Sequence, residues 1–575
     1  MKRKVFSLLA MVVVLSLLAA CAPKVVKETV IVEKPVEKVV KETVVVEKVV
    51  KETVIVEKPV EKVVTATPEP VAQIYYEDWI AQQPVCALKA NPQYMNMCVH
   101  SQLVTIDWEW KPRGMLADSW ESQDGGKVWV FHMRKDAKFH DGHPVTAEDV
   151  VFSWDVYADP KVGARKVYWT YPVLGYEDFK EGKADHLAGV EAVDEYTVRI
   201  ELTDASPLWV ALGGCGVFVL PKHLLEDIPS EELVGNEFWT DNQVGCGPFK
   251  WSKYVPDQYV EVVRFDDYFL GAPKLEKYVF VFFTEDSTVA AAYQNEEIYG
   301  TVYHRTRISV EDVERLDAIP NLDPIVMNAG KPVFLRVNHN DPAFQDVRVR
   351  QAIRYGIDVK TILETIYMGL AEPMVTGLIH DWAIPDDLEQ YEYNPEKAKE
   401  LLDAAGWDYG QEVTMYYYYG DSLNANLIAA IQANLAEIGV KFVPQKIDAA
   451  ALRAVRNDTP PGIIEYAGFG AGADPSVIAP TILCGEWIAE GYCNPRVDEL
   501  FAEGMKYATV EERAPIYQEI ARIMNEELPY VWLWSDVRPL GFNRRVWGPY
   551  EHYAEQGQIN FEYVYNEVEK WYVKD

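Results

Sequence analysis

The sequence predicts a protein of the α/β or α+β class with more than one lobe. The first observation is that strand-like alternation and helix-like spacing of apolar residues mix all along the chain beyond about residue 73. The second is size, because 575 residues, of which 49% are hydrophobic, can form two to four domains at about 100–200 residues per domain.

The N-terminus predicts export and lipidation. Basic residues 2–4 precede an apolar stretch, 5–20, that is shorter than the roughly 20 residues of a membrane-spanning helix, so we interpret residues 1–20 as a signal peptide. The tetrad Leu-Ala-Ala-Cys at 18–21 resembles a bacterial lipobox, in which the cysteine is acylated and becomes the mature N-terminus. Cys21 is therefore expected to tether the protein to the outer face of the cytoplasmic membrane. The alternative is a signal in which Cys21 is incidental.

A repeat of valine, lysine and glutamate follows this tetrad. Two copies of "KVVKETVIVEKPVE", at 24–37 and 48–61, enclose the shorter "KVVKETVVVE" at 38–47. The repeat contains no aromatic residue and no glycine, and a proline in each long copy interrupts any long helix. We interpret residues 21–70 as a stalk that ends in the Pro-rich "TATPEP". A self-associating segment is the alternative.

The globular part begins with a strand, a turn and a capped helix. The stretch "KVWVFHMRK" (127–135) alternates as a half-buried strand does, and "HDGHPVT" (140–146) is typical of a turn. Thr146 and Asp149 have the spacing of a capping box, which predicts a helix from this point to about Tyr157. Further strands are expected over 195–202 and 258–265, and amphipathic helices over 347–358, 395–406, 426–439 and 513–527.

Charge excludes one class of partner. The net charge is −34, with 89 acidic residues against 55 lysines and arginines. A surface this acidic repels phosphate backbones, so we expect no nucleic acid among the partners. A solvated acidic surface is the commonest reason for such an excess.

The cysteines predict disulfides. The chain has seven, and six remain when Cys21 is set aside for the lipid. An even number in an oxidising compartment is typical of disulfides, and six cysteines allow 15 pairings. Proximity in the chain favours Cys86–Cys98 and Cys484–Cys493, which leaves Cys215–Cys246. A metal cluster is the alternative, and the absence of any C-x-x-C disfavours it.

Five blocks of sequence occur in a specific order. They are "LADSWESQDGGKVWVFHMRKDAKFHDGHPVTAEDVVFSWD" (116–155), "VGCGPFKWSKYVPDQYVEVVRFDDYFLGAPKLEKYVF" (244–280), "FQDVRVRQAIRYGID" (344–358), "YNPEKAKELLDAAGW" (393–407) and "NPRVDEL" (494–500). Together they resemble the extracellular solute-binding proteins of family 5, the peptide- and nickel-type receptors of ABC importers. The resemblance covers nearly all of 103–548, and Cys246 stands where the family usually has threonine.

The resemblance implies a two-lobed, periplasmic-binding-protein-like fold of type II, with an extra subdomain in the first lobe. The solute would bind between the lobes and stabilise their closed arrangement. Beyond the signal peptide (1–20) and the stalk (21–70), the expected parts are the first part of lobe I (71–120), the extra subdomain (121–239), the second part of lobe I (240–330), lobe II (331–534) and the return to lobe I (535–575). Such receptors pass their solute to permease subunits, so we expect a binding protein that is not an enzyme. We also expect it to be a monomer.

The resemblance also implies where the solute binds. In peptide-binding members a motif of the type W-G/C-A-D-Y-x-x-P lines the cleft, and its aspartate binds the α-amine of the peptide. Here "AGFGAGADPSV" (467–477) has Phe469 in the place of the tryptophan and Gly472 in the place of the aspartate. The amine anchor is therefore expected to be absent, unless a shifted register brings Asp474 into its place. The expected ligand-binding residues are Phe469, Gly470, Ala471, Gly472, Asp474, Trp534, Met97 and His100.

The functional hypotheses differ in ligand and in chemistry. The leading one is a receptor for an oligopeptide or a similar oligomeric solute. The second is an oligosaccharide receptor of the same fold, which the missing aspartate and an aromatic content of 12% favour, because flat rings stack on sugars. The third is an exported hydrolase, which lacks G-x-S-x-G and H-E-x-x-H. A surface scaffold assembled through the stalk is the fourth.

No cofactor and no metal ion are expected. His132, His140 and His143 raise the question of a metal site, but the sequence shows no carboxylate–histidine cluster of defined spacing around them. The expected partners are the oligomeric solute, the permease subunits and, through the lipid, the membrane.

Overall fold

The computed structural model describes most of the chain beyond the repeat. The described residues are 73–80, 86–89, 94–107, 111–165, 167–212, 214–283, 286–301, 308–418, 422–448, 451–452, 454–455, 464–468, 474–485, 491–548 and 567–574. The expected signal peptide, Cys21 and the stalk lie outside them. Within these ranges, no helix combines the length and the apolar character needed to cross a membrane.

A four-stranded sheet contains the first described strand. Its order is β1-β10-β9-β8, with β1 parallel to β10 and the other pairs antiparallel. The strands are β1 (Ile74–Ile80), β8 (Phe249–Val255), β9 (Tyr259–Arg264) and β10 (Lys277–Phe283). Other elements of the chain before residue 322 include α2 (Tyr94–Val99), β2 (Val104–Ile106), β3 (Pro112–Gly114), α7 (Phe238–Asp241), α8 (Asp286–Gln294), η3 (Val310–Asp312) and α9 (Val313–Asp317). Strand β9 confirms the strand expected over 258–265.

A second four-stranded sheet, β4-β5-β7-β6, is antiparallel throughout. Its strands are β4 (Ala117–Gln123), β5 (Val128–Met133), β6 (Val190–Asp194) and β7 (Thr197–Glu201). Helix α3 (Ala147–Ala158) begins as the capping box predicts, because the Asp149 carboxylate accepts hydrogen bonds from the backbone N–H of Thr146 at 2.9 Å and from its hydroxyl at 2.8 Å. The short elements here are η1 (Asp124–Gly126), η2 (Val167–Trp169), α4 (Tyr176–Lys180), α5 (Lys222–Leu225) and α6 (Ser230–Leu233).

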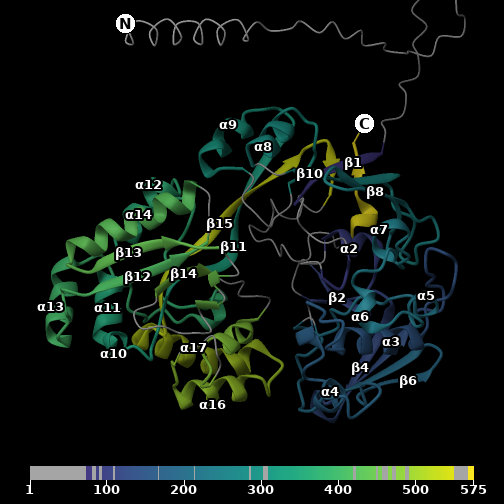
Figure 1. Ribbon diagram of the computed structural model, residues 1–575, viewed down its shortest axis with the longest axis horizontal. Helices are drawn as coiled ribbons and strands as arrows, with labels where there is room; N and C mark the ends of the chain where they lie inside the picture. The colour runs from purple at the N-terminus through teal and green to yellow at the C-terminus, as the bar shows by residue number, and fades with distance from the viewer. Residues whose placement is uncertain are drawn as a thin grey trace, which may run out of the picture. The chain divides into compact units, whose positions relative to one another are not determined.

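A five-stranded sheet, β13-β12-β14-β11-β15, forms the other large part (Figure 1). Its strands are β11 (Leu322–Val337), β12 (Glu412–Tyr417), β13 (Lys441–Lys446), β14 (Ile464–Gly468) and β15 (Tyr530–Asn543). Its helices are α10 (Pro342–Gln345), α11 (Val347–Tyr355), α12 (Val359–Ile366), η4 (Asp381–Ala383), α13 (Pro395–Ala405), α14 (Ser422–Glu437), η5 (Pro475–Thr481), α16 (Pro495–Gly504) and α17 (Val510–Glu527). Helices α11, α13, α14 and α17 confirm the four amphipathic helices expected from the sequence.

Strands β11 and β15 are antiparallel partners along most of their length, and Figure 1 shows them as the long teal and yellow strands. The ladder is interrupted between the pairs Asn328–Val537 and Pro332–Ser535. Three residues of β11 there face one residue of β15, Asp536, which makes a bulge in the ladder. A second register shift follows between Val333, which pairs with Trp534, and Phe334, which pairs with Trp532, so the ladder has two irregular steps near its middle.

Each end of this ladder belongs to a different hydrophobic core. Leu540 and Phe542 of β15 pack in the core that contains the first two sheets, whereas Trp532 and Trp534 pack in the core of the five-stranded sheet. A smaller cluster that includes Tyr293 and the first residue of β11, Leu322, adjoins the ladder. Val537, on the other side of the bulge from Trp534, still packs in the core of the five-stranded sheet, so β15 passes from one core to the other just beyond the bulge, between Val537 and Leu540.

The chain ends in β16 (Val546–Trp547), η8 (Val568–Lys570) and β17 (Tyr572–Val573). Trp571, just before β17, packs in the first core with Tyr75 of β1 at a ring-centroid distance of 5.6 Å. The C-terminal segment therefore returns to the core in which the described chain begins.

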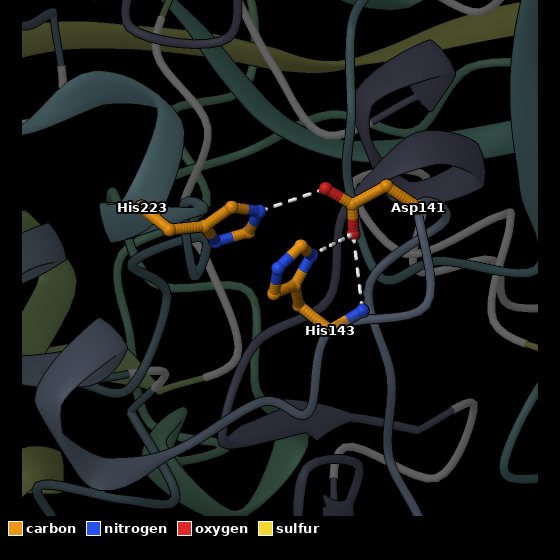
Figure 2. Close-up of side chains that lie close together, drawn as sticks. All are labelled: Asp141, His143 and His223. Atoms are coloured by element: carbon orange, nitrogen blue, oxygen red, sulfur yellow. Dashed lines mark hydrogen bonds and ion pairs between the residues drawn. The ribbon is translucent and has the colours of Figure 1, made fainter.

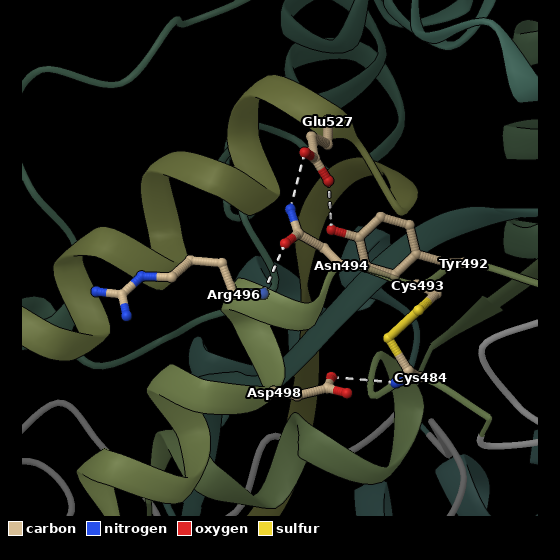
Figure 3. Close-up of a disulfide and its surroundings, with 7 residues drawn as sticks. All are labelled: Cys484, Tyr492, Cys493, Asn494, Arg496, Asp498 and Glu527. Carbon is tan, nitrogen blue, oxygen red and sulfur yellow. Dashed lines mark hydrogen bonds between the residues drawn. A yellow bond between two sulfur atoms is a disulfide. The ribbon is translucent and has the colours of Figure 1, made fainter.

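Cys484 and Cys493 form a disulfide, as the sequence predicts (Figure 3). Glu527, at the end of α17, holds the segment beside this disulfide by accepting hydrogen bonds from the hydroxyl of Tyr492 at 2.6 Å and the amide of Asn494 at 2.9 Å. Asn494 in turn caps α16 by accepting a hydrogen bond from the backbone N–H of Arg496 at 3.0 Å. The disulfide therefore lies beside the start of α16 and the end of α17.

The other two expected disulfides are absent from the structure. Cys86, Cys98, Cys215 and Cys246 are buried free thiols. Burial raises the pKa of Cys86 to about 11 and that of Cys246 to about 12, so these thiols stay protonated at neutral pH. Closeness in sequence had predicted Cys86–Cys98, and Cys215–Cys246 had followed as the remaining pair; the structure instead buries all four thiols in the first core.

Candidate functional site

The two sequence segments expected to bind the solute flank one residue of β11. Val333 pairs with Gly468, the last residue of β14, on one side and with Trp534 of β15 on the other. We call these three paired residues the Val333 rung. The stretch with the expected ligand-binding residues 469–472 begins directly after Gly468. Those four residues, Phe469, Gly470, Ala471 and Gly472, lie outside the described part of the chain.

Gly468 stands where the chain comes close to β11. A Cβ at this position would lie 3.0 Å from the carbonyl oxygen of Pro332 and 3.0 Å from Cε of Lys331. Only glycine fits without displacing these neighbours. The end of β14 is therefore fixed beside the bulge.

Trp534 is fully buried beside two tyrosine rings. Its ring centroid lies 6.1 Å from that of Tyr367 and 6.4 Å from that of Tyr466. Its indole N–H has no hydrogen-bond acceptor among the described residues. An unpaired buried donor costs about 1–3 kcal/mol, which is a reason to ask whether a bound molecule accepts this hydrogen bond.

A third segment covers the outer edge of β15 at the same level. Pro373 forms an isolated bridge with Trp534, the Met374 N–H donates to the carbonyl of Leu533 at 3.0 Å, and the Ser535 N–H donates to the carbonyl of Glu372 at 2.9 Å. The hydroxyl of Tyr367 donates to Oδ1 of Asp536 at 3.2 Å. Asp536, the single residue of β15 opposite the bulge, is thus held by Tyr367, which lies outside the sheet.

Asp474, the candidate amine anchor, is occupied by an arginine of α17. Arg513 donates to both carboxylate oxygens, with Nη2 2.7 Å from Oδ1, and the Ser476 N–H also donates to Oδ1 at 2.9 Å. Burial by itself raises the pKa of Asp474, but the hydrogen bonds from Arg513 outweigh it and hold the pKa below its usual range. The structure therefore gives Asp474 the role of a buried ion-pair partner and helix cap.

His100 and Met97 are buried in the first core. Nε2 of His100 lies 2.9 Å from Oε1 of Gln243, whose amide nitrogen donates to the carbonyl of Trp239 at 3.0 Å. This orientation of the amide makes His100 the donor, with its proton on Nε2. Burial lowers the pKa of His100 to about 4, so the ring is neutral at physiological pH. Neither side chain lies on the Val333 rung.

Sequence reasoning missed the residues around the bulge. Lys331, Tyr367 and Asp536 lie in or against it, yet none belongs to a recognisable motif. A small apolar hollow in the first core contains none of the expected ligand residues and is lined by Tyr75, Tyr299, Phe542, Asn543, Val546, Gly548 and Trp571. The Val333 rung thus remains the candidate site.

Comparison with known proteins places the chain in a family. The bacterial extracellular solute-binding proteins, family 5, match residues 111–488. The chain belongs to this family. A Brucella melitensis protein named as an ABC transporter peptide-binding protein is 30% identical over 471 residues, which are 78% of this chain and 85% of that protein. The solute-binding protein has mixed α/β content and the two-lobed type II fold that the sequence predicts.

Solved structures support the same fold. The ABC transporter substrate-binding protein CtaP of Listeria monocytogenes has a TM-score of 0.73 and 25% identity, with 88% of this chain and all of that chain covered. The oligopeptide-binding protein AppA of Bacillus subtilis, solved with a nonapeptide, has a TM-score of 0.70 and 22% identity over 87% of this chain and 99% of that chain. The solute-binding protein is thus of the type that serves ABC importers.

Proposed function

We propose that this solute-binding protein is a lipid-anchored extracytoplasmic receptor that captures an oligopeptide, or a similar oligomeric solute, for an ABC importer. One observation carries the proposal: both segments expected to bind solute flank Val333, beside the bulge of β11 and β15. The peptide preference draws on the Brucella melitensis relative and on the AppA complex, since the names of both refer to peptide binding. The protein would act without making or breaking a covalent bond.

The bulge is the proposed hinge. We place the two boundaries between lobe I and lobe II at about residues 330 and 534, on the two strands that pass between the cores. Hinges are a few residues that absorb the change in backbone angles while packed elements move as bodies. A solute that contacts both lobes stabilises the closed arrangement by its extra contacts there.

We propose that Trp534 and residues 469–472 contact the solute directly. The indole N–H of Trp534 would donate to a carbonyl or hydroxyl of the solute, which would satisfy the donor that has no acceptor among the described residues. We assign Asp474 a structural role, because Arg513 already binds both of its oxygens. Met97 and His100 would support the lobe I wall from within its core.

An oligosaccharide is the second candidate solute. Gly472 in the place of the amine-binding aspartate and the engagement of Asp474 by Arg513 favour it, because no carboxylate then remains in this motif for a peptide α-amine. The aromatic content of 12% also favours it, because flat rings stack on sugars.

Thermal unfolding of the Cys21→Ser protein with candidate solutes separates the two. Tri- to nonapeptides are expected to raise the unfolding temperature, and cello- and xylo-oligosaccharides are not. Peptides with an acetylated N-terminus should bind as well as free ones, because no carboxylate anchor is proposed. A shift with oligosaccharides alone would replace the peptide assignment, and hydrolysis of any bound oligomer would overturn the receptor function.

The lipid anchor and the partner have their own test. The wild-type chain is expected in the membrane fraction of the cells that produce it, and Cys21→Ser in the soluble exported fraction. The purified Cys21→Ser protein should sediment as a monomer, with permease subunits as its partners in the membrane. Membrane association of the Cys21→Ser chain would contradict the anchor assignment.

A further inference from the structure

Asp141, His143 and His223 form a compact cluster near the start of α3 (Figure 2). Oδ2 of Asp141 lies 2.7 Å from Nε2 of His223, and Oδ1 lies 3.2 Å from Nδ1 of His143. The two imidazole rings stack, with centroids 4.1 Å apart and 30° between their planes. Figure 2 shows both rings directed at the same carboxylate, and one potential ligand atom from each residue lies within 4.8 Å of the others.

We propose that these three residues, the Asp141 cluster, bind one divalent late transition-metal ion of the Zn²⁺ type through the carboxylate and one nitrogen of each ring. Imidazole nitrogen and carboxylate oxygen bind zinc at about 2.0–2.2 Å. Ligand atoms around a tetrahedral ion with such bonds lie about 3.4 Å apart. The observed separations of 2.7 and 3.2 Å are close to that value, so a small outward movement of the side chains admits the ion.

The ligand atoms have the chemistry that such an ion needs. A neutral imidazole carries a single N–H hydrogen, which can sit on either ring nitrogen. When it sits on Nε2 of His143 and on Nδ1 of His223, Nδ1 of His143 and Nε2 of His223 are free to coordinate an ion. All three residues are exposed, so water reaches the ion and completes its coordination. The strongly acidic chain attracts cations to its surface.

The loop that carries two of the ligands is fixed by its own hydrogen bonds. The Phe139 N–H donates to the carbonyl of His143 at 2.8 Å, and the Gly142 N–H donates to the carbonyl of Phe139 at 2.9 Å. The His143 N–H donates to Oδ1 of Asp141 at 3.2 Å. Gly142 has φ of +95°, which glycine tolerates best. Asp141 and His143 are therefore held near each other before an ion arrives.

A buried carboxylate joins this loop to the third ligand. Asp149 accepts the hydrogen bonds of Thr146 at the start of α3, and its Oδ1 also accepts a hydrogen bond from the backbone N–H of Lys222 at 3.1 Å. Lys222 begins α5 and is followed by His223. Asp149 therefore sets the position of α5 relative to the loop, and we regard it as a positioning residue for the cluster.

Neighbouring histidines are excluded as ligands by their contacts or position. His140 is committed to the backbone, since its Nδ1 accepts from the Gly245 N–H at 3.2 Å and its Nε2 lies 3.0 Å from the carbonyl oxygen of Gly247. His132, an exposed residue of β5, lies outside the cluster and offers a matched control. The inference rests on this geometry alone and is independent of the proposed solute.

Isothermal titration of the EDTA-stripped Cys21→Ser protein with Zn²⁺ tests the proposal. One equivalent is expected to bind. His143→Gln and His223→Gln should each weaken binding at least tenfold, and His132→Gln should leave it unchanged. Asp149→Asn should weaken binding less than the loss of a ligand. Co²⁺ provides a second probe, because its visible absorption should change on binding to wild type and not to His143→Gln.

The unfolding temperature in EDTA shows whether each variant is folded, and substitutions of the exposed histidines should leave it unchanged. Equal Zn²⁺ affinity in wild type, His143→Gln and His223→Gln would overturn the proposal, as would the absence of Zn²⁺ binding by the wild type. A hydrogen-bonded His–Asp–His network without affinity for metal would then be the remaining description of the cluster.

Discussion

Gly468 and Trp534 face each other across a single residue, since both pair with Val333 of β11. They are 66 positions apart in the sequence. The expected ligand-binding residues 469–472 follow Gly468 directly, and Trp534 is itself an expected ligand-binding residue. The position of β11 between β14 and β15 brings these two segments to one level of the sheet.

Trp534→Phe is expected to weaken solute binding about tenfold and to leave stability almost unchanged. The substitution keeps an aromatic ring in the core but removes the indole N–H, and one hydrogen bond contributes about 1–1.5 kcal/mol, or about tenfold in affinity. Titration calorimetry with the best solute from the thermal screen measures the loss. Trp532→Phe, in the same strand and equally buried, is the control and should retain full affinity. Equal affinities of all three proteins would contradict a contact between Trp534 and the solute.

Asp474→Asn is expected to destabilise the protein by about 3–5 kcal/mol, because it leaves the Arg513 guanidinium buried without its counter-charge. Because the pKa of Asp474 is depressed, the pair stabilises the fold above the unfolded-state pKa, and this contribution is lost as the pH falls through the folded-state pKa. Urea unfolding at pH 7 measures the cost. Asp387→Asn, which removes the exposed partner of Arg522 on the same helix, should have little effect. A stable Asp474→Asn protein that no longer binds peptides would instead revive the amine-anchor hypothesis.

Stability is expected to fall between pH 6.5 and pH 4 through the buried histidines. Burial lowers the pKa of His100 to about 4 and that of His339 to about 4, whereas an unfolded histidine takes up its proton near pH 6.5. The unfolded state therefore binds more protons in this window, and acid favours it by about 1.4 kcal/mol per pH unit for each such residue.

Unfolding free energies of wild type and His100→Gln, compared at pH 7 and pH 4.5, isolate the His100 share. The variant should lose about 2–3 kcal/mol less on acidification than the wild type does. His132→Gln, which alters an exposed ring, should follow the wild type. Parallel acid curves for wild type and His100→Gln would show that His100 is not buried neutral in the folded protein.

Alkylation of the unfolded but unreduced Cys21→Ser protein is expected to label four thiols. Cys86, Cys98, Cys215 and Cys246 should react once the chain is unfolded, and the remaining pair only after reduction. In the folded protein all four should react slowly, because burial keeps them protonated and covered. Intact mass spectrometry counts the labels. A chain without reactive thiols would restore the pairings Cys86–Cys98 and Cys215–Cys246.

Features set by neighbouring residues were predictable from the sequence, and those set by packing were not. Thr146 and Asp149 predict the start of α3 because a capping box is complete within four residues. Closeness in sequence predicted the Cys484–Cys493 bond correctly and the Cys86–Cys98 bond wrongly, because packing decides whether two nearby thiols meet. The metal-type cluster was not, because His223 reaches Asp141 only through the fold, 82 positions away.

The candidate site shows the same limit. The family resemblance suggested Trp534 as a ring that contacts solute, but only the structure shows its indole buried beside Tyr367 and Tyr466. Asp474 matched a motif position, and its commitment to Arg513 depends on how α17 packs against the segment. Motifs therefore indicated a candidate region, whereas the availability of each side chain depended on distant partners.

The bulge at residues 329–331 also determines which face of the sheet each later residue of β11 occupies. Side chains alternate between the two faces of a strand, so the loss of one residue from 329–331 would invert every position from Val333 to Val337. Arg336 would then leave Glu465 and carry its charge into the apolar layer on the reverse face. This segment should consequently tolerate exchange of its residues far better than any change in its length.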